Sequence, residues 1–328
     1  MSKSKVYFVK LNELDKVKDL IPELPNSLGI KVHFGEEGNI TYLPASYVKE
    51  ISGWFNNPSL VECNVLYKSP RSQSSTHIAL AKEHGFDFAP IDILDGEDGD
   101  DATAIKIDGK HFKECWLGSG LAKYKSLLVV SHFKGHIIAG FGGALKNLSM
   151  GLASRRGKLA QHAFVKHSVD SEKCISCGIC INNCPVEAIN FDAEQKAEIN
   201  QTKCISCSKC IAVCPVDAIA IPQKGKDIKV FRERLAEHAL AGTKDRKCFY
   251  INFLMNITKG CDCAGEAMPK MTEDIGILVS NDPVAIDQAS YDLVIKKCED
   301  FKAQNGDEQL IHGEEIGLRK REYEIVNV

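Results

Sequence analysis

Two copies of one cysteine motif, thirty residues apart, constrain this chain more than any other feature of its sequence. In each copy three cysteines are spaced at Cys-x-x-Cys intervals, and a fourth cysteine follows after three residues and precedes a proline. Such tight loops let three thiolates converge on one cubane iron–sulfur cluster, while the fourth cysteine of each copy ligates the other cluster. The spacing therefore predicts two [4Fe-4S] clusters, held by Cys174, Cys177, Cys180 and Cys214 and by Cys204, Cys207, Cys210 and Cys184.

Two other uses of clustered cysteines fit this spacing less well. A zinc site needs only four ligands, usually as two pairs, and a disulfide framework is typical of small secreted chains. The segment resembles bacterial dicluster ferredoxins, because the two copies also share the residues around their cysteines. The resemblance implies an α+β ferredoxin domain with two [4Fe-4S] clusters at residues 169–222. We expect it to be inserted into one discontinuous domain made of residues 1–168 and 223–328.

The rest of the chain has the composition of an ordinary globular protein. It has 328 residues, of which 44% are apolar and 26% charged, enough for a substantial core beside the cysteine segment. A net charge of −3 favours neither nucleic acid nor a membrane surface as a partner. No segment approaches the roughly 20 apolar residues that cross a bilayer. Eight of the 14 cysteines belong to the motifs, and we expect the others to be reduced thiols in the cytoplasm of an anaerobic or low-oxygen cell.

On both sides of the cysteine segment the sequence alternates between short apolar runs and helical periodicity. Residues 127–131 form a continuous apolar run, as in a strand buried on both faces of a parallel sheet. The alternation predicts an α/β domain with a largely parallel sheet and flanking helices. Strands are expected at residues 5–10, 29–34, 61–67, 127–131, 248–255 and 275–280, and helices at 46–54, 76–84, 144–152, 227–241 and 283–297.

A long stretch without acidic residues predicts an anionic ligand. Residues 115–169 contain no aspartate or glutamate but carry eight lysines and arginines and four histidines, although a solvated basic face is the alternative. Glycines, among them Gly142 and Gly143, separate the strand at 127–131 from the helix at 144–152, and backbone N–H groups there can approach an anion closely. The loop is neither a Walker A motif nor a dinucleotide fingerprint. The expected pocket residues are His132, Lys134, His136, Lys146 and His162, with Lys146 or Arg155 neutralising the charge of the ligand.

Two further turns carry candidate site residues. Arg71 follows the strand at 61–67 and can offer an anion a bidentate fork, or it can belong to an ordinary capped helix start. Cys261 and Cys263 follow the strand at 248–255, and a Cys-x-Cys pair can chelate an additional metal or cluster, or form a redox pair. Cys248 is a candidate third ligand, and buried inert thiols are the alternative.

Two aspartates lie at the start of the helix at 283–297. Asp282 is placed to cap that helix, and Asp287 lies in its first turns, where an acid complements the helix dipole.

With these residues in view, the chain resembles the domain-of-unknown-function 362 family of iron–sulfur proteins. The motifs that carry the resemblance cover nearly the whole chain and lie at residues 69–71, 132–136, 142–148, 261–263 and 274–287. The chain is more distantly similar to the N-terminal domain of nickel-pincer lactate racemases. That resemblance implies a histidine, a lysine that holds the cofactor covalently, and a nickel-ligating histidine at His136, Lys146 and His162. The chain has no counterpart of the large second domain of the racemases, and the racemases carry no ferredoxin.

Three functions are compatible with these features. The first is an oxidoreductase in which the clusters deliver electrons to a small anionic substrate, with His136 as proton donor. The second is an electron carrier or adaptor that docks on a larger redox complex through a partner protein. The third is racemase-like chemistry with a tethered nickel cofactor.

Overall fold

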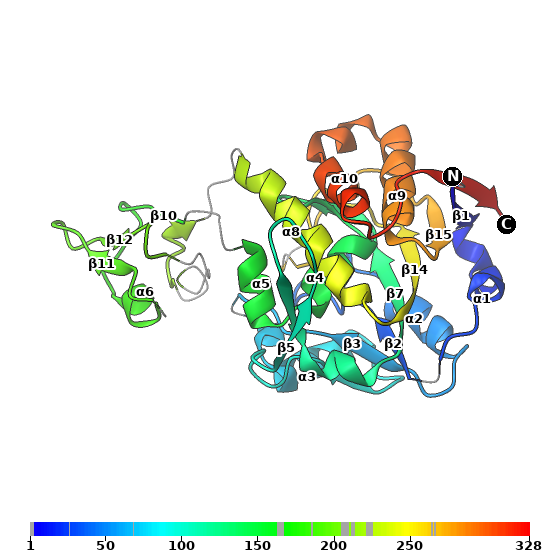
Figure 1. Cartoon of the computed structure of the whole chain (residues 1–328), viewed down its shortest axis with the longest axis horizontal. Helices are drawn as coiled ribbons and strands as arrows, with labels where there is room; N and C mark the ends of the chain where they lie inside the picture. Colours follow the sequence, from blue (N-terminus) through cyan, green and yellow to red (C-terminus); the bar gives the residue numbers. More distant parts are fainter. Residues whose placement is uncertain are drawn as a thin grey trace.

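A computed structural model describes residues 3–25, 27–67, 69–162, 167–184, 186–204, 210, 214–220, 226–263, 265 and 267–328. One expected cluster ligand, Cys207, lies outside these residues. The main feature is an eight-stranded sheet with the order β16-β1-β15-β14-β7-β2-β3-β4 (Figure 1). Its neighbours run parallel except at β15, which is antiparallel to both β1 and β14. The strands are β1 (Ser4–Val9), β2 (Leu28–Lys31), β3 (Ser59–Glu62), β4 (Ile91–Ile93), β7 (Ser126–His132), β14 (Lys247–Leu254), β15 (Gly276–Ser280) and β16 (Tyr323–Asn327).

Helices cover both faces of this sheet, and on each face an apolar cluster packs the helices against the strands. Strand β7 contributes to both clusters, because Val129 belongs to one and Val130 to the other. All seven residues of this strand are buried. One face is covered by α1 (Asp15–Leu20), α2 (Ala45–Ser52) and α3 (Ser74–Glu83), and the other by α4 (Ala144–Leu152), α8 (Lys226–Thr243), α9 (Pro283–Lys297) and α10 (Asp307–Glu315). The expected α/β fold with a largely parallel sheet is therefore confirmed.

Smaller elements complete the body of the protein. Two hairpins are formed by β5 (Ala102–Lys106) with β6 (Glu114–Gly118) and by β8 (Lys134–His136) with β9 (Gly140–Gly142). Helix α5 (Arg155–His162) follows α4. Short 3-10 helices lie at Leu11–Glu13, Pro70–Ser72, Ser119–Lys123 and Glu299–Gln304. No helix in the described part of the chain combines the length and the apolar composition that a bilayer crossing needs.

The cysteine segment leaves the body after α5 and rejoins it at α8 (Figure 1). Strand β10 (Ser168–Val169) pairs with β13 (Ile219–Ala220), β11 (Ile189–Phe191) pairs with β12 (Ala197–Ile199), and helix α6 (Ile179–Asn182) follows the first cysteine loop. These elements share a small apolar cluster of their own. Strand β7 precedes the segment and β14 follows it, yet the two are neighbours in the large sheet.

Most of the predicted elements are present, and two helices, α4 and α9, have the predicted ends. The strand predicted at residues 61–67 was too long, because β3 ends at Glu62. The next backbone N–H groups bond outside the sheet: Asn64 N donates to Asp95 Oδ1 at 2.9 Å, and Val65 N donates to the Arg71 carbonyl at 3.0 Å. These bonds turn the chain away from the sheet and toward the site.

Candidate functional site

A cavity of about 280 Å³ lies where parallel strands of the large sheet end. Side chains reach it from the residues after β2, β3 and β7, from the β8–β9 hairpin, from α4 and α5, and from Cys263. In open α/β sheets ligands bind at the carboxyl ends of the strands, so this cavity lies where a ligand site is expected. The structure brings these predicted residues together along its wall: Arg71, His132, Lys134, His136, Gly142, Gly143, Lys146 and His162.

Two predicted residues lie elsewhere. Arg155 donates from Nε to the Asp98 carbonyl at 2.9 Å on the outer side of α5, so the prediction that it neutralises a ligand was wrong. Lys158, one turn further along α5, lines the cavity instead and belongs to the same acid-free stretch. Cys248 is the second residue of strand β14, whereas Cys261 follows the other end of that strand and lies beside Cys263 and His136, so Cys248 is not a third ligand.

Arg71 is a buried cation whose guanidinium N–H groups already have partners within the protein. Its Nε donates to His77 Nε2 at 3.2 Å, and its terminal nitrogens contact Glu62 at 3.5 Å and Glu36 at 3.6 Å. Lys31 completes the network with a contact of 2.8 Å to Glu62. Burial and the Arg71 charge lower the pKa of His77 well below its ordinary value, so His77 is neutral. Arg71 therefore contributes positive charge to the cavity wall, but its fork is held by internal carboxylates.

A second buried network joins Lys134, Asp262 and His132. Asp262 Oδ2 lies 2.8 Å from Lys134 Nζ and 2.8 Å from His132 Nδ1. The other nitrogen of His132 lies 2.7 Å from the Met255 carbonyl, so both ring nitrogens face acceptors. Burial alone raises the pKa of Asp262, but the charges and hydrogen bonds of His132 and Lys134 outweigh it and hold that pKa below its usual range. This ionised carboxylate fixes the loop between the two cysteines.

The glycine loop binds an anion, but the anion is part of the protein. Asp287 Oδ1 accepts from Ala144 N at 2.8 Å and Oδ2 accepts from Leu145 N at 2.9 Å, which are the first N–H groups of α4. A Cβ atom at Gly143 would lie 2.3 Å from Asp287 Oδ1, so the glycine makes room for the carboxylate. The expectation that these N–H groups cradle an external ligand was wrong. Asp287 also serves α4 and not its own helix α9, which Asp282 caps by accepting from Val284 N and Ala285 N.

His136 and His162 are both neutral but offer the cavity different groups. His136 Nδ1 accepts from Ile138 N at 3.2 Å and from Ala139 N at 3.0 Å within the β8–β9 hairpin. Burial and the charges of Lys146 and Lys134 lower the pKa of His136 well below its ordinary value. A neutral imidazole carries one proton, so that of His136 is on Nε2. Burial lowers the pKa of His162 to about 4. His136 can therefore donate a hydrogen bond to a ligand, but its expected role as proton donor needs an imidazolium that these lysines disfavour.

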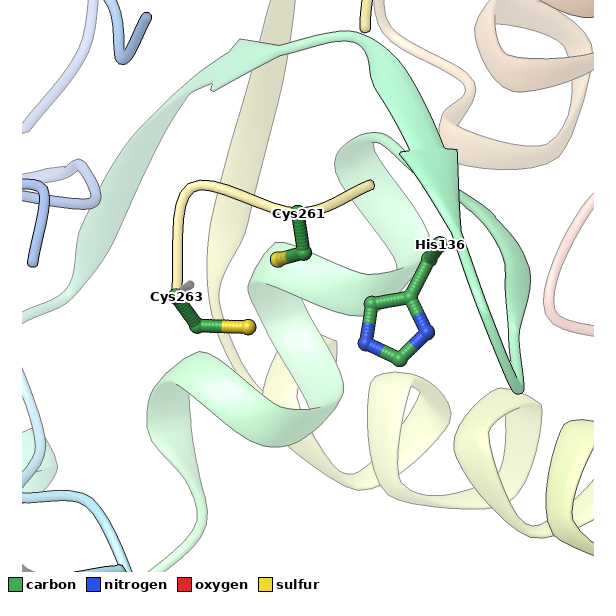
Figure 2. Close-up of side chains that lie close together, drawn as sticks. All are labelled: His136, Cys261 and Cys263. Carbon is green, nitrogen blue, oxygen red and sulfur yellow. The ribbon is translucent and has the colours of Figure 1, made fainter. Parts of the chain in front are cut away.

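Cys261, Cys263 and His136 form a compact group that sequence reasoning had left apart. The two sulfurs and a ring nitrogen of His136 all lie within 4.8 Å of one another, and Figure 2 shows the three side chains turned toward each other. Lys146 Nζ lies 3.8 Å from Cys261 Sγ. Gly135 allows this approach, because its N–H donates to the Thr258 carbonyl at 2.8 Å and a Cβ there would lie 2.3 Å from the Lys259 carbonyl oxygen.

The cysteine segment contains its own small apolar cavity. Four of the expected ligands line it, namely Cys174, Cys177, Cys180 and Cys214. Backbone N–H groups donate to the fourth cysteine of each copy, from Ala188 to Cys184 Sγ and from Ala218 to Cys214 Sγ, both at 3.2 Å. Hydrogen bonds of this kind stabilise thiolates. The cysteines of this segment are thus chemically suited to hold a metal cofactor.

The fold and this site define an α/β protein with a basic, thiol-bearing cavity and a separate cysteine-rich segment. Residues 28–292 match the family described as domain of unknown function (DUF362), and the chain belongs to that family. The family resemblance inferred from the motifs is thereby confirmed.

Two solved structures are similar to the chain. The lactate racemase apoprotein from Thermoanaerobacterium thermosaccharolyticum is 12% identical with a TM-score of 0.45, and the match covers 90% of this chain and 58% of that one. A protein from Thermotoga maritima is 11% identical with a TM-score of 0.43, over 89% of this chain and 58% of that one. The chain therefore spans less than two thirds of the length of either. No curated protein matches the sequence.

Proposed function

We propose that the protein is an iron–sulfur oxidoreductase that transfers electrons between two [4Fe-4S] clusters and a small anionic substrate in the cavity. The observation that carries the proposal is the attachment of the cysteine segment. The segment is inserted between α5 and α8, and both helices line the cavity, through His162 and Phe231. The cysteine segment is thus attached at both of its ends to helices that line the cavity. The division into a ferredoxin domain at 169–222 and a discontinuous α/β domain is part of this proposal.

The proposed clusters fit the residues of the segment. The cavity lined by Cys174, Cys177, Cys180 and Cys214 matches the first ligand set that the spacing predicts, and N–H···S bonds favour ionised thiolates. When bound, the clusters supply electrons one at a time. Ile175 lies between two of these cysteines and is 59% exposed, which suits contact with a redox partner protein. The thiols outside the segment, among them Cys63 and Cys298, form no disulfide, which supports a reducing compartment such as the cytoplasm.

The charges of the cavity support an anionic substrate. Glu62 and Glu36 are matched by Lys31 and Arg71, and Asp262 is matched by Lys134. Lys146 and Lys158 form no ion pair with a carboxylate within the described part of the chain, and Lys146 Nζ lies 3.8 Å from Cys261 Sγ. Even with that thiol ionised, Lys158 leaves the cavity a positive charge in excess. A cavity of about 280 Å³ suits a small carboxylate or phosphate. In this site Lys146 and Lys158 bind and orient the anion, and His136 donates a hydrogen bond from Nε2.

One observation favours the racemase-like alternative, since His136, Lys146 and His162 line the same cavity. His162, which is at the position of the nickel-ligating histidine, has a buried Nδ1 with no hydrogen-bond partner in the described part of the chain and could ligate a metal. His136 could not, because its Nδ1 is bonded to the hairpin and its Nε2 carries the proton. In this function, however, the cysteine segment would take no part in the chemistry. We therefore place this function second.

The test is the reoxidation of chemically reduced protein, followed by visible absorbance without oxygen. A panel of small 2-oxo acids and α,β-unsaturated carboxylates is offered as electron acceptor. We expect at least one to speed reoxidation in the wild type, and Lys146→Met to slow it at least tenfold with unchanged iron content. Lys123→Met, at an exposed lysine paired with Asp92, is the matched control and should keep the wild-type rate. Equal rates in the wild type and Lys146→Met, or reoxidation by partner proteins alone, would identify a carrier and overturn the proposal.

A further inference from the structure

The Cys-x-Cys loop holds two sulfurs side by side on the wall of the cavity. The Cys261 and Cys263 sulfurs lie within 4.8 Å of each other, and Figure 2 shows both side chains on the same side of the loop. Cys261 is 7% exposed, and Cys263 lines the cavity itself. Asp262 lies between them in the sequence, and its contacts with Lys134 and His132 hold the loop in place. Two sulfurs in this arrangement can approach each other without a large change of the backbone.

The surroundings make the two sulfurs unequal. The hydrogen bond from Cys263 lowers the pKa of Cys261 well below its ordinary value, and Lys146 and Lys134 add to this effect against the opposing effect of burial. The same hydrogen bond and burial raise the pKa of Cys263 well above its ordinary value. The surroundings therefore favour the ionised form of Cys261 and the protonated form of Cys263. An ionised thiol beside a protonated one is the starting state of a dithiol that forms a disulfide.

A metal ion fits this group less well than a sulfur pair does. A tetrahedral site for zinc or iron takes four ligands, and the loop supplies only two sulfurs. His136 is the nearest third donor, but the nitrogen that faces the sulfurs is Nε2, because Nδ1 accepts from the hairpin backbone. A proton on Nε2 prevents ligation at that nitrogen.

We propose that Cys261 and Cys263 are a redox-active pair that cycles between a thiol–thiolate and an intramolecular disulfide, and so converts single electrons into a two-electron step. On oxidation, the sulfur–sulfur bond forms, the Cys263 proton is released, and two electrons leave one at a time, one to each [4Fe-4S] cluster. On reduction, two reduced clusters return one electron each, the bond breaks, and Cys263 takes up one proton. The electron source of this cycle rests on the proposed function, whereas the cycle of the sulfurs does not.

The test measures the pair independently of the clusters. Full-length protein is equilibrated without oxygen in buffers of reduced and oxidised dithiothreitol, quenched in acid and treated with N-ethylmaleimide. Trypsin cuts after Lys259 and Lys270, and the peptide between them contains Cys261 and Cys263 as its only cysteines. We expect two labels on this peptide at the reducing end and none at the oxidising end, with the slope of a two-electron couple.

One variant tests the effect of Lys146 on the redox midpoint of the pair, and a second serves as its control. Lys146 stabilises the thiolate of the reduced form, so Lys146→Met should shift the midpoint about tenfold in the dithiothreitol ratio, about 30 mV, in favour of the disulfide. Cys298→Ser, at a thiol outside the cavity, should leave the midpoint unchanged. Two labels under all buffers would overturn the proposal, as would a stoichiometric metal that protects both thiols in the native protein. If the two cysteines lose their labels at the oxidising end while none of the anions speeds reoxidation of the clusters, the proposed function is refuted. The redox pair proposed here would then still hold.

Discussion

Replacing Asp262 by asparagine should destabilise the protein strongly, because that carboxylate pairs with a buried lysine and accepts a hydrogen bond from a buried histidine. Asp262 is fully buried and lies 2.8 Å from both Lys134 Nζ and His132 Nδ1. The amide keeps the shape of the side chain but removes its charge, so Lys134 stays buried without a counter-ion and His132 loses an ionised acceptor. Removing one partner of a buried ion pair costs about 3–5 kcal/mol. That is a large fraction of the roughly 5–15 kcal/mol that stabilises a typical domain.

The assay is urea unfolding under anaerobic conditions, followed by tryptophan fluorescence. Both tryptophans, Trp54 and Trp116, lie in the body of the protein, so the signal reports on the domain that contains the site. The control is Asp108→Asn, which removes an exposed pair with Lys113 at 2.7 Å and should leave the midpoint where it is. A loss below about 1 kcal/mol for Asp262→Asn would refute the reasoning, since it would mean that Lys134 does not depend on this carboxylate as its counter-ion.

The same carboxylate predicts a response to acid. The pKa of Asp262 is held below its usual range in the folded protein, so its contribution to stability is complete above the unfolded pKa of about 4. It is lost as the pH falls from there toward the folded pKa. The asparagine variant should lack this part of the acid sensitivity, which urea midpoints measured between neutral and acidic pH can show.

Two more predictions concern buried groups outside that network. Asp287→Ala removes the acceptor of two N–H groups of α4 and of Asn252 Nδ2, three hydrogen bonds of about 1 kcal/mol each, so unfolding in urea should show a loss of roughly 3 kcal/mol. A loss near zero would mean that α4 is capped in another way. Burial lowers the pKa of His162 to about 4 and that of His238 to about 3, so between pH 7 and 5 the unfolded chain takes up protons that the folded chain refuses. The free energy of unfolding should fall by about 2 kcal/mol for each over that interval, and His238→Gln should remove its share; an unchanged slope would contradict the assignment.

The parts of the fold that the sequence predicts best are those with local signals. Helix α9 was predicted to the residue because Asp282 and Pro283 mark its start, and α4 because a glycine pair precedes it. Strand β3 was predicted too long because the partners that end it, Asp95 and Arg71, come from other elements. No local signal distinguishes an apolar run inside a sheet from its extension beyond the last pair of bonded strands.

At the candidate site, too, the contacts that could not be predicted are those between residues far apart in the sequence. The acid-free stretch predicted a basic cavity, and Lys134, His136 and Lys146 do meet there. Asp287 lies more than 140 residues from the N–H groups that it binds, and Cys261 lies 115 residues from Lys146. Pairings over such distances depend on the order of strands in the sheet, which the sequence of one chain does not reveal. For that reason the internal anion was mistaken for an external one.

The most direct test of the account is the content of iron and acid-labile sulfide per chain in protein purified without oxygen. The proposed function requires about eight irons and as many sulfides, as two [4Fe-4S] clusters contain, and no stoichiometric nickel. Zinc on the cysteine segment, with no labile sulfide in fresh anaerobic protein, would contradict the clusters and with them the electron-transfer function.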